Sequence, residues 1–77
     1  MRHFHVQRPQ KFQFLRIKHM TKGAILYEME KDILIWVPRG WIFKFNNKDK
    51  WFSVKEQFAV EVEMKIEAEK KALNESI

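Results

Sequence analysis

The sequence contains no cysteine, which excludes disulfide bonds, thiolate zinc sites, iron–sulfur clusters and a cysteine nucleophile, and favours an intracellular protein. Glycine and proline occur only twice each, so few points interrupt the regular backbone. No apolar run approaches the roughly 20 residues needed to cross a bilayer, since the run Ile33–Val37 stops at Pro38. These absences predict a small domain that has no membrane partner and no disulfide framework.

Aromatic residues are abundant. Seven Phe, three Trp and one Tyr stand among 77 residues, and each can bury on the order of 150 to 250 Å². A chain this short buries only about 60% of its unfolded surface, so it needs large apolar side chains to form a core. This composition excludes a disordered tail and predicts one folded domain.

Basic residues are concentrated at the front of the chain, although the net charge of the whole is only +5. The first 27 residues contain six Lys or Arg residues and no acid, whereas residues 51–77 hold six glutamates against four lysines. Such asymmetry indicates one end that faces a polyanion and another that faces solvent or protein. The alternative is that the net charge serves solubility alone.

Alternating apolar and polar residues predict four strands. The polar opening around Pro9 makes 1–10 a basic N-terminal arm, and a single small domain follows at 11–77. A change of parity between Phe14 and Leu15 indicates a bulge or a strand buried on both faces. The Asn- and Lys-rich segment 46–50 is the clearest loop. The strands are expected at 11–18, 24–30, 33–37 and 41–45.

The segment after this loop fits two templates. Residues 58–66 alternate as a strand would, yet the apolar positions from Val54 onward also repeat every four residues. Ser53 and Glu56 have the spacing of a helix capping box, and good helix formers dominate from Glu63 to Leu73. We therefore expect a helix over about 54–74, with a strand at 58–62 as the alternative.

The expected fold class is α+β: a four-stranded antiparallel meander with one C-terminal helix packed on one face. The residues expected in the core are those on the inward side of these elements, namely Ile25, Tyr27, Ile33, Ile35, Val37, Phe43, Val54, Phe58, Val62 and Ile66.

Three stretches share a pattern: Thr21–Leu26 (TKGAIL), Ile35–Ile42 (IWVPRGWI) and Lys50–Phe52 (KWF). Together they are similar to small phage and prophage proteins, in which a Thr-x-x-Ala-x-Leu strand leads to Trp-Val-Pro-Lys-Ser-x-Ile and then to Trp-Phe at the start of a helix. Arg39-Gly40 stands where the pattern has Lys-Ser, so no role of that serine carries over. The resemblance covers about 30 residues and implies a mobile-element origin and a hairpin-plus-helix fold.

Groups suited to catalysis or metal binding are scarce. Ser53 has a capping position, and the carboxylates beside the hairpin turn are ordinary solvated charges. His3 and His5 would share one face of a strand, but His19 lies elsewhere in the chain, so a third metal ligand is missing. The chain is therefore expected to be no enzyme and to use neither a metal nor a cofactor.

The expected function is nucleic-acid binding in the cytoplasm of a bacterial host of a phage. Trp41 and Trp36 are candidates for base stacking or partner contact. The phosphate contacts are expected from a front patch and a second patch, that is from Arg2, Arg8, Lys11, Arg16, Lys18 and Lys22, and from Lys44, Lys48 and Lys50.

A phage-encoded inhibitor or adaptor that binds a host protein complex is the alternative, with an anti-defence, anti-CRISPR-like or host-takeover role. A sheet with a helix on one face leaves its other face open, so surplus apolar surface could bind a partner or form a homodimer through the open sheet face or the helix end. Nucleic-acid binding requires the basic side chains on one face, whereas an inhibitor needs a compact patch of about 800 Å².

Overall fold

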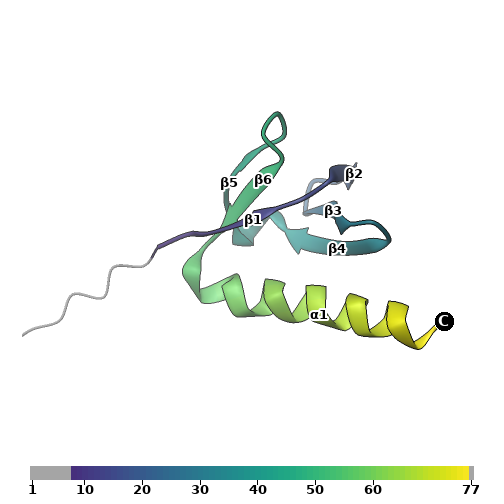
Figure 1. Cartoon of the computed structure of the whole chain (residues 1–77). Coiled ribbons are helices and arrows are strands. Elements are labelled where there is room, and N and C mark those ends of the chain that lie inside the picture. Colours follow the sequence, from purple (N-terminus) through teal and green to yellow (C-terminus); the bar gives the residue numbers. More distant parts are fainter. Residues whose placement is uncertain (1–7, 77) are drawn as a thin grey trace, which may run out of the picture.

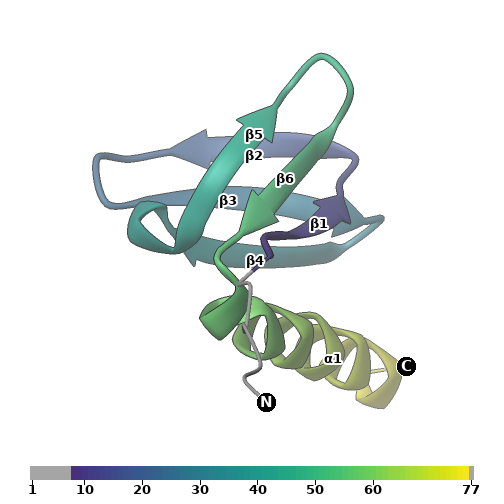
Figure 2. The same ribbon diagram turned by 90° about the vertical axis from the view of Figure 1, so that its left-hand side faces the viewer.

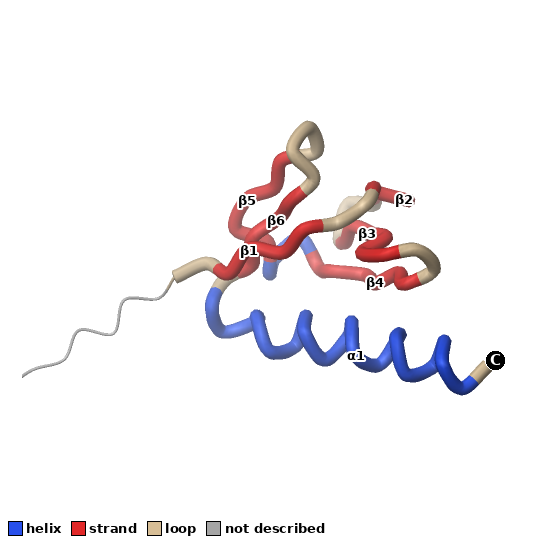
Figure 3. Tube along the Cα trace, in the orientation of Figure 1, coloured by secondary structure: helices blue, strands red, loops and turns tan. Residues whose placement is uncertain are grey.

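A computed structural model of the chain describes residues 8–76, which form six strands and a long C-terminal helix (Figure 1). Two short 3₁₀ turns join the elements: η1 (Arg39–Trp41) connects β4 to β5, and η2 (Glu56–Phe58) leads from β6 into helix α1 (Ala59–Glu75), as Figure 3 shows. The fold class is α+β. The strands are β1 (Gln10–Gln13), β2 (Arg16–Met20), β3 (Ala24–Glu30), β4 (Ile33–Pro38), β5 (Ile42–Asn46) and β6 (Trp51–Val54).

The strands form two three-stranded antiparallel sheets. Sheet A has the order β1-β6-β5 and sheet B the order β2-β3-β4, and Figure 2 shows their strands crossing at a steep angle. The prediction of one four-stranded meander is wrong because the strand expected at 11–18 breaks where its parity changes. The Phe14 N–H donates to the Lys50 carbonyl at 3.0 Å, beside sheet A, whereas the Leu15 N–H donates to the Glu28 carbonyl of β3 at 2.8 Å.

Rings from both sheets meet in the core. Tyr27 of β3 stacks on Phe52 of β6 with ring centroids 4.1 Å apart, and Phe14 contacts both rings at 4.7 and 6.1 Å. The tyrosine and Phe52 have no exposed surface. The sheets therefore face each other through these rings, and their outer faces point to opposite sides of the molecule.

Most of the predicted core is buried. Phe43 is the exception, since 63% of its surface is exposed. The pairing of β5 with β6 slips by one residue between Ile42 and Lys44, and this bulge turns the extra residue out of the core. Phe58 and Ile66 are half-buried, and the buried members of the predicted set are Ile25, Tyr27, Ile33, Ile35, Val37, Val54 and Val62.

The helix expected over 54–74 begins later than predicted, because residues 51–54 form β6. Ser53 caps no helix: it is buried in the middle strand of sheet A, where its hydroxyl donates to the Lys44 carbonyl at 3.3 Å. The backbone groups of β6 are paired with both neighbouring strands. A helix starting at Val54 would leave the backbone of 51–53 without these partners. The alternative strand at 58–62 is also wrong, since Ala59–Glu75 is helical.

Helix α1 runs along β4, which is one of the two edge strands of sheet B (Figure 1). Its buried side is formed by Ala59 and Val62, with Ile66 packed against the core. Near its end, the Lys70 ammonium lies 3.0 Å from the Glu30 carboxylate, which raises the pKa of Lys70 through a hydrogen bond and charge attraction. The helix thus closes one side of the two-sheet core. Within residues 8–76, no helix is long and apolar enough to cross a membrane.

Candidate nucleic-acid interface

The outer face of sheet A combines lysines with a tryptophan. Because alternate residues of a strand point to opposite faces, the neighbours of the buried Phe52 and Val54 point away from the core. The register aligns these outward residues in two rows across the three strands. The rows are Lys11, Ser53 and Lys44, then Gln13, Trp51 and Asn46. We call these six residues the sheet A face, and none of them is acidic.

Lys11 and Trp51 contact each other on this face. The Lys11 ammonium lies 4.3 Å from the centroid of the Trp51 ring, within the range of a cation–π interaction. Lys44 extends from the other neighbouring strand, and the backbones of β1 and β5 are about 10 Å apart on either side of β6. Ser53, between the two lysines, is small and buried. The result is an aromatic ring with a cation on each side of its strand.

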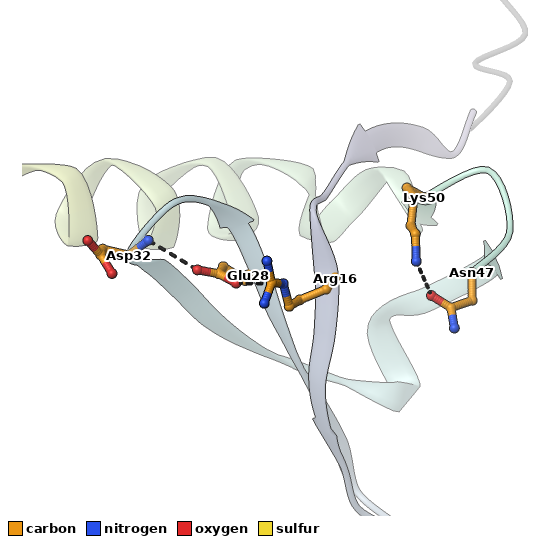
Figure 4. A network of polar contacts seen from close by, with 5 residues as sticks. All are labelled: Arg16, Glu28, Asp32, Asn47 and Lys50. Carbon is orange, nitrogen blue, oxygen red and sulfur yellow. Dashed lines mark hydrogen bonds and ion pairs between the residues drawn. The ribbon is translucent and has the colours of Figure 1, made fainter.

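The loop between β5 and β6 extends this basic surface. The Asn46 side-chain oxygen accepts the Asp49 N–H at 2.8 Å, and Lys50 adopts a left-handed backbone with a φ of 62°. These features make a tight turn that exposes Lys48. The Lys50 ammonium lies 3.4 Å from the Asn47 side-chain oxygen (Figure 4). The members of the predicted second patch, Lys44, Lys48 and Lys50, therefore all lie on one hairpin.

The predicted front patch is divided between the two sheets. Arg16 starts β2, and its Nε lies 3.1 Å from Glu28 Oε1 on sheet B (Figure 4). Lys18 occupies the bulge of β2, and Lys22 lies in the turn before β3. Among the members of this patch that the structure describes, Lys11 alone lies on the sheet A face. Arg16, Lys18 and Lys22 do not join it, because the chain changes sheets after Phe14.

Arg8 is exposed, and its backbone N–H donates to Glu56 Oε1 at 2.8 Å, which ties the start of the described chain to η2. Gln10, the last residue of the predicted arm, is the first residue of β1, and its side-chain amide donates to Glu63 Oε2 at 3.0 Å. Arg2 and the other arm residues up to position 7 lie outside the described residues.

The two tryptophans singled out from sequence lie elsewhere. Trp41 is half-buried, stacks on Phe58 with centroids 4.9 Å apart, and has the Lys65 ammonium 5.7 Å from its ring. Trp36 is 43% exposed on the outer face of sheet B, where the His19 ring meets it edge-on at 6.0 Å. Trp41 thus joins η1 to the start of the helix, and Trp36 belongs to the opposite side of the molecule from the sheet A face.

Sequence reasoning missed Trp51 as a surface residue, because the resemblance places Trp51-Phe52 just before a helix and Ser53 was expected to cap that helix. The alternation of Trp51 and Ser53 with the apolar Phe52 and Val54 was the signal for a strand with one outward side. Among residues 8–76, no three His, Asp or Glu side chains lie together as metal ligands would. Comparison of the chain with protein-family models, curated proteins and solved structures finds no match.

Proposed function

We propose that this protein is a non-enzymatic nucleic-acid-binding protein whose interface is the sheet A face together with the β5–β6 loop. The observation that carries the proposal is the row of Lys11, Ser53 and Lys44 with Trp51 beside it and no acidic neighbour in either row. Lysines that hold phosphates and an aromatic ring that stacks a base are the two components of sequence-tolerant nucleic-acid binding.

The Lys11–Trp51 contact supplies the mechanism. In the free protein the Lys11 ammonium lies over the Trp51 ring, whose face attracts its positive charge. A phosphate competes for that ammonium with a full negative charge, and the movement of Lys11 toward it exposes the ring to a base. Charge neutralisation and stacking are therefore coupled at one place on the sheet.

The experiment is fluorescence anisotropy of a labelled oligonucleotide between about 50 and 200 mM salt. Removing two charges by Lys11→Gln with Lys44→Gln lowers the salt slope by about 1.4, since each lost contact on a single strand contributes about 0.7. The matched control removes two charges from sheet B and its turn by Lys18→Gln with Lys22→Gln. Equal losses in both double variants mean that total charge, and not the sheet A face, governs binding.

A second candidate function is the phage-type inhibitor or adaptor that binds a host protein. The observation that favours it is the outer face of sheet B, where Trp36 is 43% exposed beside the half-buried Leu26 and Leu34. This candidate predicts a nuclease-resistant complex with one defined host protein that Trp36→Ala abolishes and that the Lys11→Gln/Lys44→Gln variant retains. The resemblance of Thr21–Leu26 and Ile35–Ile42 to phage proteins is compatible with both candidates.

A further inference from the structure

A hollow of about 360 Å³ lies where the sheet A face meets the start of the helix, lined by Pro9, Phe43, Lys55, Glu56 and Gln57. Strand β6 lies between β1 and β5. Pro9, just before β1, and Phe43, of β5, therefore stand on either side of the chain that leaves β6. Two of its lining residues are apolar and three are polar, and its volume is at the lower end of the range for small-molecule sites.

Local structure builds this hollow from both sides. The β5 bulge turns Phe43 outward and leaves 63% of its surface exposed. On the other side, hydrogen bonds from the Arg8 backbone to Glu56 and from the Gln10 side chain to Glu63 hold the chain around Pro9 against the helix start. An exposed phenylalanine presented by a bulge at a surface hollow is a feature that core packing does not require.

The hollow is continuous with the sheet A face. Pro9 lies two residues before Lys11, Lys55 lies two residues after Ser53, and Phe43 directly precedes Lys44. Along β5, Asn46, the partner of the half-buried Trp51, lies three positions after Phe43, so the two rings are roughly 10 Å apart along the strand. Lys44 lies between them. A ligand that spans both rings must therefore pass an ammonium group.

We propose that the Phe43 hollow holds one base of a single-stranded nucleic acid whose backbone passes Lys44 and Lys11 and which stacks a second base on Trp51. This inference rests on the proposed function and specifies its ligand. The cations along the path favour a polyanion over an apolar peptide. Gln57 lines the hollow, and a glutamine side chain carries both a donor and an acceptor for a base edge.

Single-stranded character follows from the geometry of stacking. Bases within a duplex cover each other's faces, so an aromatic side chain reaches such a face only when the base is unstacked. Two rings roughly 10 Å apart would need two separately unstacked bases, which a single strand provides at little cost. The protein therefore binds a single strand more tightly than a duplex of the same sequence.

The test compares Phe43→Ala and Phe43→Trp with the parent chain on an oligothymidylate, the matching RNA and a duplex. The control is Met64→Ala on α1, which truncates an equally exposed apolar side chain away from the hollow, since Met64 is 62% exposed. Phe43→Ala weakens single-strand binding about 5- to 100-fold and leaves duplex affinity and the salt slope unchanged. Phe43→Trp binds the single strand as tightly as the parent chain. Met64→Ala has no effect. Comparison of the DNA and RNA arms identifies the preferred strand.

Several results would overturn the inference while leaving the proposed function intact. One is an unchanged single-strand affinity in Phe43→Ala, and another is an equal loss of affinity for the single strand and the duplex. A third is a concentration-dependent dimer that Phe43→Ala abolishes, because the hollow would then hold a second copy of the chain. A 2-aminopurine base in the single strand gives a reading that needs no variant: its fluorescence is quenched when it stacks on a ring, and an unquenched base at every position contradicts the inference. Absence of any nucleic-acid binding at low salt refutes the proposed function itself.

Discussion

Replacing Tyr27 by phenylalanine should make the protein more stable. The Tyr27 ring has no exposed surface, and its hydroxyl is buried without a hydrogen-bond partner among the described residues. An unpaired buried hydroxyl costs about 1 to 3 kcal/mol, and its removal leaves the stack on Phe52 in place. We expect Tyr27→Phe to gain about 1 kcal/mol, which raises the melting temperature by about 4 to 8 °C in a domain of this size.

The same hydroxyl links stability to alkaline pH. Burial raises the pKa of Tyr27 well above its ordinary value of 10.0, and the charge of Arg39 only partly opposes this. Between the ordinary pKa and the raised one, the unfolded chain ionises its tyrosine and the folded chain does not. The free energy of unfolding is therefore unaffected by this ionisation below about pH 10. Above that pH it falls, by about 1.4 kcal/mol per pH unit.

The assay is thermal unfolding by circular dichroism from neutral pH to above pH 10, for the parent chain and Tyr27→Phe. Because Tyr27 is the only tyrosine in the sequence, absorbance titration of the phenolate reports this group alone. The gain of Tyr27→Phe at neutral pH should widen as the pH rises. A lower melting temperature in Tyr27→Phe, or a phenolate that titrates near pH 10 in the folded protein, would refute the reasoning.

Further substitutions test the helix, the turn and the stack at the helix start by chemical denaturation. Val62→Ala should cost about 2 kcal/mol, because Val62 is fully buried, whereas Val60→Ala should cost almost nothing, because Val60 is 58% exposed. Equal losses would contradict the helix. Asp32→Gly should be neutral or should stabilise by up to about 1 kcal/mol, since Asp32 has a φ of 67°; a clear loss would show that its side chain is needed. Phe58→Leu should lose about 1 kcal/mol by removing the stack on Trp41, and an unchanged unfolding midpoint would show that the stack contributes nothing.

Local patterns were enough to predict the central hairpin and the helix. The strands expected at 24–30 and 33–37 correspond to β3 and β4, whose pairing is confirmed, and helix-forming residues after Glu63 lie in α1. The loop at 46–50 also separates β5 from β6. In each case the signal lies within a few residues, so alternation, turn chemistry and helix propensity describe it directly.

The remaining features depend on contacts between distant segments. The parity change at Phe14 marked the break in the first strand, but only the pairing of β1 with β6 makes that break a change of sheet. Ser53 fits a capping box locally, and the partners that make it a strand residue come from β1 and β5. The same pairing turns Trp51 outward beside Lys11, so the candidate interface could not be derived from sequence spacing.

The three tryptophans provide the most direct test of the sheet A face, because each indole N–H reports a different part of the surface. Titration of the ¹⁵N-labelled protein with a short single-stranded oligonucleotide, with indole signals assigned through Trp→Phe variants, follows all three signals at once. We expect the Trp51 indole and the Lys11 and Lys44 amides to shift along a saturable curve, while the Trp36 indole on sheet B stays in place. A shift of the Trp36 indole with an unmoved Trp51 indole would contradict the proposed interface.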